Sequence, residues 1–141
     1  MHPEAIFTAA SSLATAGWLA LLLFPRRRWA HWHLAGVGIP ALLSLLYVVL
    51  LAMHAPGAEG GFSTLAGVRA LFARDGLLLA GWVHYLAFDL FLGAWMCRRA
   101  TAEGLSPWRL YPALPLTFLA GPAGLLVFLG LRALPRRQGV P

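Results

Sequence analysis

The sequence predicts an all-α membrane protein with four transmembrane helices and a short amphipathic surface helix between the second and third. Two observations predict this fold class. The 141 residues are 60% hydrophobic and 11% charged, whereas soluble domains carry about 25% charged residues. Four apolar segments also reach the length of about 20 residues that a helix needs to cross a hydrocarbon core of about 30 Å. The chain is therefore expected to form one membrane domain over residues 1–141.

The four predicted spans end at basic or turn-forming sequences. They cover residues 4–24, 33–53, 76–96 and 108–134 and are followed by PRRR, APGAEGG, Arg98-Arg99 and PRR, respectively. Between the second and third spans, GFSTLAGVRALFARD (61–75) places apolar residues at roughly helical spacing. Ser63 or Thr64 is a candidate N-cap there. This segment is therefore expected to be a short helix at the membrane surface.

The arginines set the expected orientation. With the N-terminus outside, the inner set is Arg26, Arg27, Arg28, Arg98, Arg99 and Arg109, and the outer set is Arg69, Arg74, Arg132, Arg136 and Arg137. The first loop counts most in the positive-inside rule, which places Arg26–Arg28 in the cytoplasm. Both termini are then expected outside a bacterial inner membrane. The net charge of +6 comes from arginines that lie at helix ends, where they can contact anionic lipid headgroups. No nucleic-acid partner is therefore expected.

The third span carries polar residues where a membrane helix rarely has them. In GWVHYLAFDLF (81–91), a helical wheel places Trp82, His84, Tyr85 and Asp89 on one arc of about half the helix. The opposite face carries Val83, Ala87, Leu90 and Ala94, which suit lipid or another helix. Ionisable residues inside a membrane are costly and indicate function. This polar arc is therefore the candidate site.

Asp89 lies near the middle of the predicted span, about 20 Å along the helix from Gly76. No cation is predicted at its level, so the carboxyl group is expected to be protonated, bound to a metal, or hydrogen-bonded to His84, Tyr85 or the fourth span. The fourth span contains three prolines, at positions 112, 115 and 122, and a mid-depth Thr117. Each proline lacks a backbone donor and frees a carbonyl one turn earlier, which suits a helix that lines a cavity.

A first-row metal is the alternative for this site. His54, His84 and Asp89 are the candidate ligands, because imidazole and carboxylate bind such ions. A haem with two histidine ligands is not expected, because the spans contain no second deep histidine.

Two motifs carry a family resemblance. The sequences GWVHYLAFDLF and LTFLAGPAGLL, within about 64–132, resemble the abscisic-acid-deficient-four-like family of small four-helix membrane proteins. Trp82, His84 and Asp89 match the family's third-helix pattern. The family usually has an arginine after the glycine of the FDLFxG motif. This chain has Ala94 there, so no role of that arginine is carried over.

The resemblance implies chemistry on a carotenoid or related isoprenoid. Plant members are tied to neoxanthin synthesis, in which an epoxide opens and an allene forms without net oxidation. Such isomerase chemistry needs an acid and a base but no cofactor. Asp89 is the candidate acid and His84 the base, with Tyr85 orienting either.

Substrate contacts are expected from Trp82, Phe88, Phe91 and Thr117. Oxidative cleavage, as linked to some bacterial and algal relatives, would instead use the metal. The alternative to an enzyme is a non-catalytic binder of carotenoid, quinone or lipid, or an assembly factor, and a homo-oligomer is compatible with each of these functions.

Overall fold

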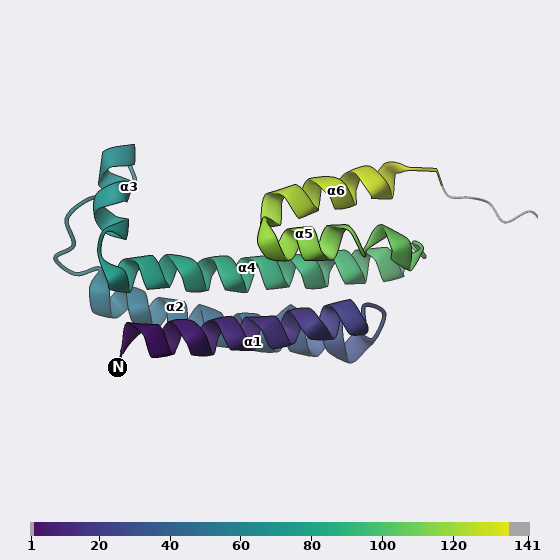
Figure 1. Ribbon diagram of the computed structural model, residues 1–141, viewed down its shortest axis with the longest axis horizontal. Coiled ribbons are helices and arrows are strands. Elements are labelled where there is room, and N and C mark those ends of the chain that lie inside the picture. Colours follow the sequence, from purple (N-terminus) through teal and green to yellow (C-terminus); the bar gives the residue numbers. More distant parts are fainter. Residues whose placement is uncertain (1, 136–141) are drawn as a thin grey trace, which may run out of the picture.

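The computed structural model describes residues 2–135, and within that range the chain is helical without strands (Figure 1). The elements are α1 (Pro3–Leu23), the π-helix η1 (Trp29–Gly38), α2 (Ile39–His54), α3 (Leu65–Phe72), α4 (Asp75–Ala102), the 3₁₀-helix η2 (Pro107–Arg109), α5 (Ala113–Leu119) and α6 (Gly121–Ala133). The prediction of an all-α fold is confirmed for the described residues.

Three helices are long and apolar enough to cross a membrane. They are α1 with 21 residues, η1 and α2 as one continuous helix of 26 residues, and α4 with 28 residues. They correspond to the first three predicted spans. In Figure 1, α4 lies alongside both α1 and α2. The α4 residues buried between them include Val83, Ala87, Leu90 and Ala94, so the apolar face packs against helices rather than lipid.

Glycine allows α1 and α4 to approach closely. A Cβ atom added at Gly93 of α4 would lie 2.7 Å from the ring of Trp18 on α1. No larger residue fits there without moving the indole, which is itself buried. Small residues at helix crossings are typical of membrane bundles, because they let dispersion contacts form between backbones.

The prediction of one continuous fourth span over 108–134 is corrected by the structure. This segment forms two helices, α5 and α6, which are separated at Ala120 by a non-helical backbone with φ −153° and ψ 79°. Pro122 follows in the first turn of α6 and offers no N–H group to the turn before it. The chain reverses at this point, and α6 returns alongside α5 as a helical hairpin (Figure 1).

Side-chain hydrogen bonds hold the two ends of the hairpin together. Arg109, in η2, donates from Nη1 to the carbonyl oxygens of Leu131 at 2.8 Å and Leu134 at 3.0 Å. Its Nη2 donates to the carbonyl oxygen of Pro135 at 3.0 Å. These carbonyls lie in and just after the last turn of α6, where most carbonyls lack an intrahelical donor. The hairpin therefore begins and ends at the same end of the bundle.

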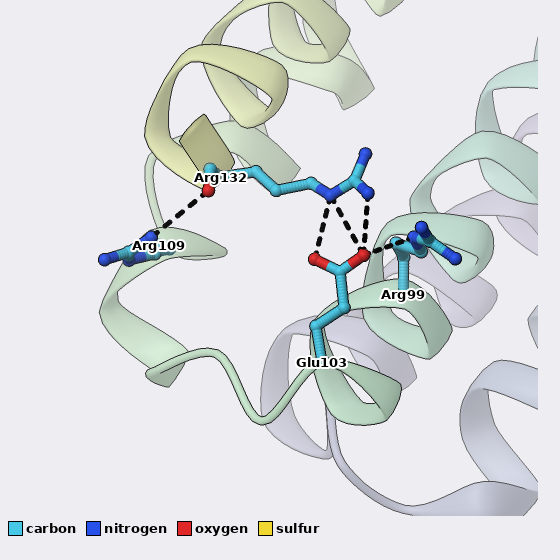
Figure 2. Close-up of polar contacts among 4 residues, drawn as sticks. All are labelled: Arg99, Glu103, Arg109 and Arg132. Atoms are coloured by element: carbon cyan, nitrogen blue, oxygen red, sulfur yellow. Dashed lines mark hydrogen bonds and ion pairs between the residues drawn. The ribbon is translucent and has the colours of Figure 1, made fainter. Parts of the chain in front are cut away.

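A second polar cluster ties α6 to α4 at this end (Figure 2). The Glu103 carboxylate accepts from Nε of Arg132 at 2.8 Å and pairs with Nη2 of Arg132 at 2.7 Å. It also pairs with Nε of Arg99 at 2.5 Å. Figure 2 shows the carboxylate between the two guanidinium groups. Arg132 is therefore at the same end as Arg99, whereas the sequence had placed these two arginines on opposite sides.

The hairpin changes the distribution of arginines along the bundle. Within residues 2–135, the arginine-rich end holds Arg26, Arg27, Arg28, Arg98, Arg99, Arg109 and Arg132, and the other end holds Arg69 and Arg74. Arg136 and Arg137 lie outside the described residues. The charge asymmetry that the positive-inside rule uses is therefore larger than a four-span arrangement would give.

The short helix α3 forms where the sequence predicts one. Thr64 is its N-cap, and its Oγ1 accepts from the N–H of Gly67 at 3.0 Å. In Figure 1, α3 runs across the direction of the long helices. The ring of Phe72 packs on Gly81, where an added Cβ would come within 2.7 Å of it. The helix α3 therefore packs against the beginning of α4.

Candidate functional site

The polar arc of α4 lies on the side of this helix that α1 and α2 leave open. Trp82 is 40% exposed and Phe88 is 60% exposed, whereas Val83 on the opposite face is fully buried. In Figure 1, the hairpin covers only the second half of α4, and α3 lies at the beginning of α4. We call the residues Trp82, His84, Tyr85, Phe88 and Asp89 the open face of α4.

Asp89 lies against the tip of the hairpin. A Cβ atom added at Gly121, the first residue of α6, would collide with the carboxylate and lie 2.7 Å from its Cγ. The Oδ2 atom of Asp89 is buried and has no hydrogen-bond partner among the described residues. The carboxyl group therefore faces the beginning of a helix, where the helix dipole is positive, and it interacts with the phenol of Tyr85, one turn earlier on α4.

Tyr85 connects the open face to the same hairpin tip. Its hydroxyl donates to the carbonyl oxygen of Phe118, in the last turn of α5, at 3.3 Å. Pro122 stands four residues after Phe118 and has no N–H to offer this carbonyl. The expectation that a proline frees a carbonyl one turn earlier is confirmed here. The phenol of Tyr85 and the carboxyl of Asp89 thus both lie at the break between α5 and α6.

His84 lies on the other side of Tyr85, toward α2. Its ring stacks on Phe88 at a centroid distance of 4.6 Å and lies 5.4 Å from the ring of Tyr47 on α2. It lines an apolar cavity of about 310 Å³ between α2, α3 and α4, together with Tyr47, Leu71, Phe72 and Gly81. In the described part of the chain, no hydrogen bond joins His84 to Asp89. The open face therefore presents the imidazole and the carboxyl on two sides of Tyr85.

Trp82 lies at the edge of the open face nearest α1. Its Nε1 donates to Oγ of Ser11 at 3.0 Å. Its ring lies 5.3 Å from Phe7 and 5.6 Å from Tyr85, measured between centroids. A second cavity of about 370 Å³ adjoins this tryptophan between the N-terminal turns of α1 and α4. Aromatic rings therefore line the open face from α1 to α2.

The two other residues expected to touch a substrate differ in exposure. Thr117 is fully buried, and its Oγ1 donates to the carbonyl oxygen of Ala113 at 2.8 Å within α5. Phe91 is 46% exposed, one turn after Phe88, and lies 5.4 Å from the guanidinium carbon of Arg98. Periodicity placed both at a suitable depth, but it does not determine which neighbour each side chain contacts.

The candidate metal ligands do not converge. The ring of His54 packs on Gly76, where an added Cβ would collide with it. Gly76 precedes Asp89 by about 20 Å along α4. No three His, Cys, Asp or Glu side chains gather into a metal-binding group among residues 2–135. The residues present therefore do not fit the metal site considered from the sequence, and no step is assigned to a metal.

Three partners of the open face were not predicted from the sequence. They are Gly121, the carbonyl of Phe118, and Tyr47. The spacing of Phe118 and Pro122 is the signal that points to the free carbonyl, and the glycine before Pro122 points to a close contact at the turn. Tyr47 has a weaker signal, as the one tyrosine in the second span.

Comparison with known proteins gives a family assignment. The family model described as ABA DEFICIENT 4-like matches residues 5–128. No curated protein and no solved structure matches the chain. The matched range includes the three long helices and the hairpin tip with Asp89 and Gly121. The chain therefore belongs to the ABA DEFICIENT 4-like family.

Proposed function

We propose that this protein is an integral membrane enzyme that opens an epoxide in a carotenoid or related isoprenoid. Family membership supports a carotenoid-related membrane protein. The observation that carries the proposal is the buried Oδ2 of Asp89 at the hairpin tip, next to an aromatic surface open to lipid. A buried polar group without a partner is costly, and proteins retain such groups mostly at functional sites.

Asp89 is the acid in this proposal. The carboxyl is protonated, because an unpaired charge at this depth is expensive. It gives its proton to the epoxide oxygen as the carbon–oxygen bond breaks. The partially positive N-terminus of α6, beside Gly121, then stabilises the carboxylate that forms. The tip of the hairpin thus supplies the electrostatic support that the acid needs after it has reacted.

His84 is the base and removes a proton from the polyene, which forms the allene. One proton enters the substrate at oxygen and one leaves at carbon, so the reaction is an isomerisation and needs no oxidant. Tyr85 lies between the two groups, and its hydrogen bond to Phe118 fixes the position of its phenol. We assign Tyr85 to orient the substrate oxygen toward Asp89.

The surroundings suit a long apolar substrate. Trp82 and Phe88 present half-exposed rings on which a flat polyene can lie. The cavity next to His84 is almost wholly apolar, and α3 closes one side of it. A carotenoid dissolved in the bilayer reaches this face laterally, without crossing a protein barrier. Isomerisation is preferred over oxidative cleavage because the candidate metal ligands lie apart.

A non-catalytic binder is the second candidate function. The cavity of about 310 Å³ under α3 favours it, because a cavity lined mainly by apolar side chains can hold the end of a carotenoid, quinone or lipid without any chemistry. The two functions differ in one respect that can be measured. A binder returns its ligand unchanged, whereas the enzyme converts it.

The hairpin also supports an orientation. The arginine-rich end belongs in the cytoplasm by the positive-inside rule, which places the N-terminus outside a bacterial inner membrane. Because the hairpin begins and ends at the arginine-rich end, residue 135 lies on the cytoplasmic side. This replaces the earlier expectation that both ends of the chain are outside.

The pigment profile of a producing host tests the proposed function. The protein is expressed in a bacterium that makes epoxidised carotenoids, and extracted pigments are compared by chromatography with those of a host carrying an empty vector. The expected result is a new isomer of the same mass that is absent with His84→Ala. Recovery of unchanged epoxide bound to the purified protein, with no new isomer, would identify a binder.

A further inference from the structure

A second polar site lies on α4, about 14 Å beyond Asp89 toward the arginine-rich end. Arg98 donates from Nη1 to the carbonyl oxygen of His31 at 2.6 Å. Its guanidinium carbon lies 5.0 Å from the ring centroid of Trp32 and 5.4 Å from that of Phe91. The guanidinium is thus fixed between η1 and α4, with aromatic rings of both helices beside it.

The side chain of Arg98 extends back along α4 toward the middle of the helix bundle. Helical side chains tilt toward the N-terminus of their helix, and α4 runs toward the arginine-rich end (Figure 1). The contact with Phe91, two turns earlier, agrees with this direction. Arginines near the ends of membrane helices usually extend outward to the headgroups instead. The guanidinium of Arg98 therefore lies further from the end of the bundle than it would if the side chain extended outward.

No carboxylate neutralises this charge within residues 2–135. Glu103 pairs with Arg99 and Arg132, and Asp89 lies at the hairpin tip. The other three acids, Glu4, Glu59 and Asp75, lie toward the opposite end of the bundle. A guanidinium carries five N–H donors, and one bond to His31 leaves most of them available to a ligand.

The backbone of η1 packs closely against the guanidinium of Arg98. A Cβ atom added at Gly36 would collide with Nη1 of Arg98. Gly36 belongs to the ten-residue π-helix η1, a rare geometry that is frequent at functional sites. In the same helix, His31 is only 3% exposed, and neither ring nitrogen has a hydrogen-bond partner among the described residues. The close approach of Gly36 and the carbonyl of His31 therefore holds the guanidinium against η1.

We propose that Arg98, with Trp32 and Phe91 beside it, binds the phosphate group of an anionic membrane lipid from the leaflet at the arginine-rich end. A guanidinium matches two phosphate oxygens with parallel hydrogen bonds. Trp32 and Phe91 are 48% and 46% exposed on the outside of the bundle. An anion that reaches a guanidinium among these apolar rings arrives attached to acyl chains, so a lipid is the source rather than free phosphate.

Native mass spectrometry of the full-length protein in detergent micelles tests this site. The protein is mixed with equal amounts of phosphatidylglycerol and phosphatidylcholine, and the ratio of the two bound lipids is measured. Wild-type protein is expected to prefer the anionic lipid. Arg98→Gln is expected to lower that preference about tenfold, because it removes a charge-assisted pair of hydrogen bonds. Adding millimolar inorganic phosphate is expected to leave the bound lipid in place.

Arg99→Gln is the matched control, because Arg99 is the adjacent arginine and pairs with Glu103 instead. It is expected to keep most of the preference. Arg98→Lys is a second variant that keeps the charge but loses the planar fork, and it is expected to lower the preference several-fold. Equal preference in wild type, Arg98→Gln and Arg98→Lys would overturn the proposal. Displacement of the lipid by inorganic phosphate would overturn the lipid as the source.

Discussion

The carboxyl group of Asp89 rests against the α-carbon of Gly121, where the hairpin of α5 and α6 turns back. One residue belongs to the central membrane helix and the other begins the last helix, so this contact fixes how far the hairpin reaches into the bundle. It also places a carboxyl group whose Oδ2 is buried halfway along α4, beside the aromatic surface of this helix.

Gly121→Ala is expected to destabilise the protein by about 1–3 kcal/mol, because the added methyl group overlaps the carboxylate of Asp89. Thermal unfolding in detergent micelles measures the loss. Gly130→Ala is the control, since an added Cβ there meets nothing within 4 Å. The double variant Gly121→Ala/Asp89→Ala is expected to regain much of the stability, because the overlapping carboxylate is gone. A double variant no more stable than Gly121→Ala alone would show that the contact is not the cause.

Tyr85→Phe is expected to destabilise the protein by about 1 kcal/mol, because it removes one hydrogen bond and leaves the carbonyl of Phe118 without a donor. If Tyr85 orients the substrate, product formation falls while pigment binding is retained. Tyr111→Phe serves as the control, because this tyrosine is 53% exposed. Pigment conversion per bound pigment is the measurement. Equal conversion by Tyr85→Phe and wild type would remove Tyr85 from the proposed reaction.

Arg109→Gln is expected to loosen the end of α6. The guanidinium donates to four backbone carbonyls at the end of α6, and losing it costs about 2 kcal/mol or more, since hydrogen bonds to charged groups are the stronger ones. Hydrogen exchange followed by mass spectrometry is expected to show faster exchange in α6 than in α1. Arg27→Gln, a change at an exposed arginine, should leave α6 as in wild type. Unchanged protection of α6 in Arg109→Gln would contradict the capping role.

The hairpin predicts which positions share a side of the membrane. Single cysteines are introduced at Glu59, Ala102 and Leu134 in a Cys97→Ala background and labelled with a membrane-impermeant thiol reagent in intact cells. Ala102→Cys and Leu134→Cys are expected to be either both labelled or both protected, because α5 and α6 return to the same end. Glu59→Cys is expected to give the other result. If only one of Ala102→Cys and Leu134→Cys is labelled, the segment between them crosses the membrane as a fourth continuous span.

The sequence predicted three spans correctly because each is a single apolar block of membrane length. It predicted the fourth wrongly because hydropathy measures how long an apolar segment is and not whether the chain reverses within it. The reversal depends on the backbone at Ala120 and on Arg109, which contacts carbonyls more than 20 residues away. Such long-range bonds leave no periodic signal.

The candidate site was likewise predicted only in part from the sequence. Helical periodicity placed Trp82, His84, Tyr85 and Asp89 on one arc, and the structure has them on the open face of α4. Their partners come from four other helices: Ser11 from α1, Tyr47 from α2, Phe118 from α5 and Gly121 from α6. The sequence around Pro122 gives a local signal for the last two, whereas Ser11 and Tyr47 are brought close by the tertiary fold. The helical wheel therefore identified the polar face of α4. It did not identify the neighbours on other helices, which place the imidazole of His84 and the carboxyl of Asp89 in different surroundings.

A comparison of two aspartate variants of α4 tests whether the Asp89 carboxyl acts as an acid on an isoprenoid at the hairpin tip. Asp89→Asn and Asp75→Asn are expressed at equal membrane levels in the host that makes epoxidised carotenoids, and the isomer formed is quantified. Asp75 is an exposed carboxylate on the same helix, so its variant controls for charge removal. Asp75→Asn is expected to form the isomer. Asp89→Asn is expected to form at least a hundredfold less of it, which is roughly what removing a general acid costs. Full product from a correctly inserted Asp89→Asn protein would contradict it.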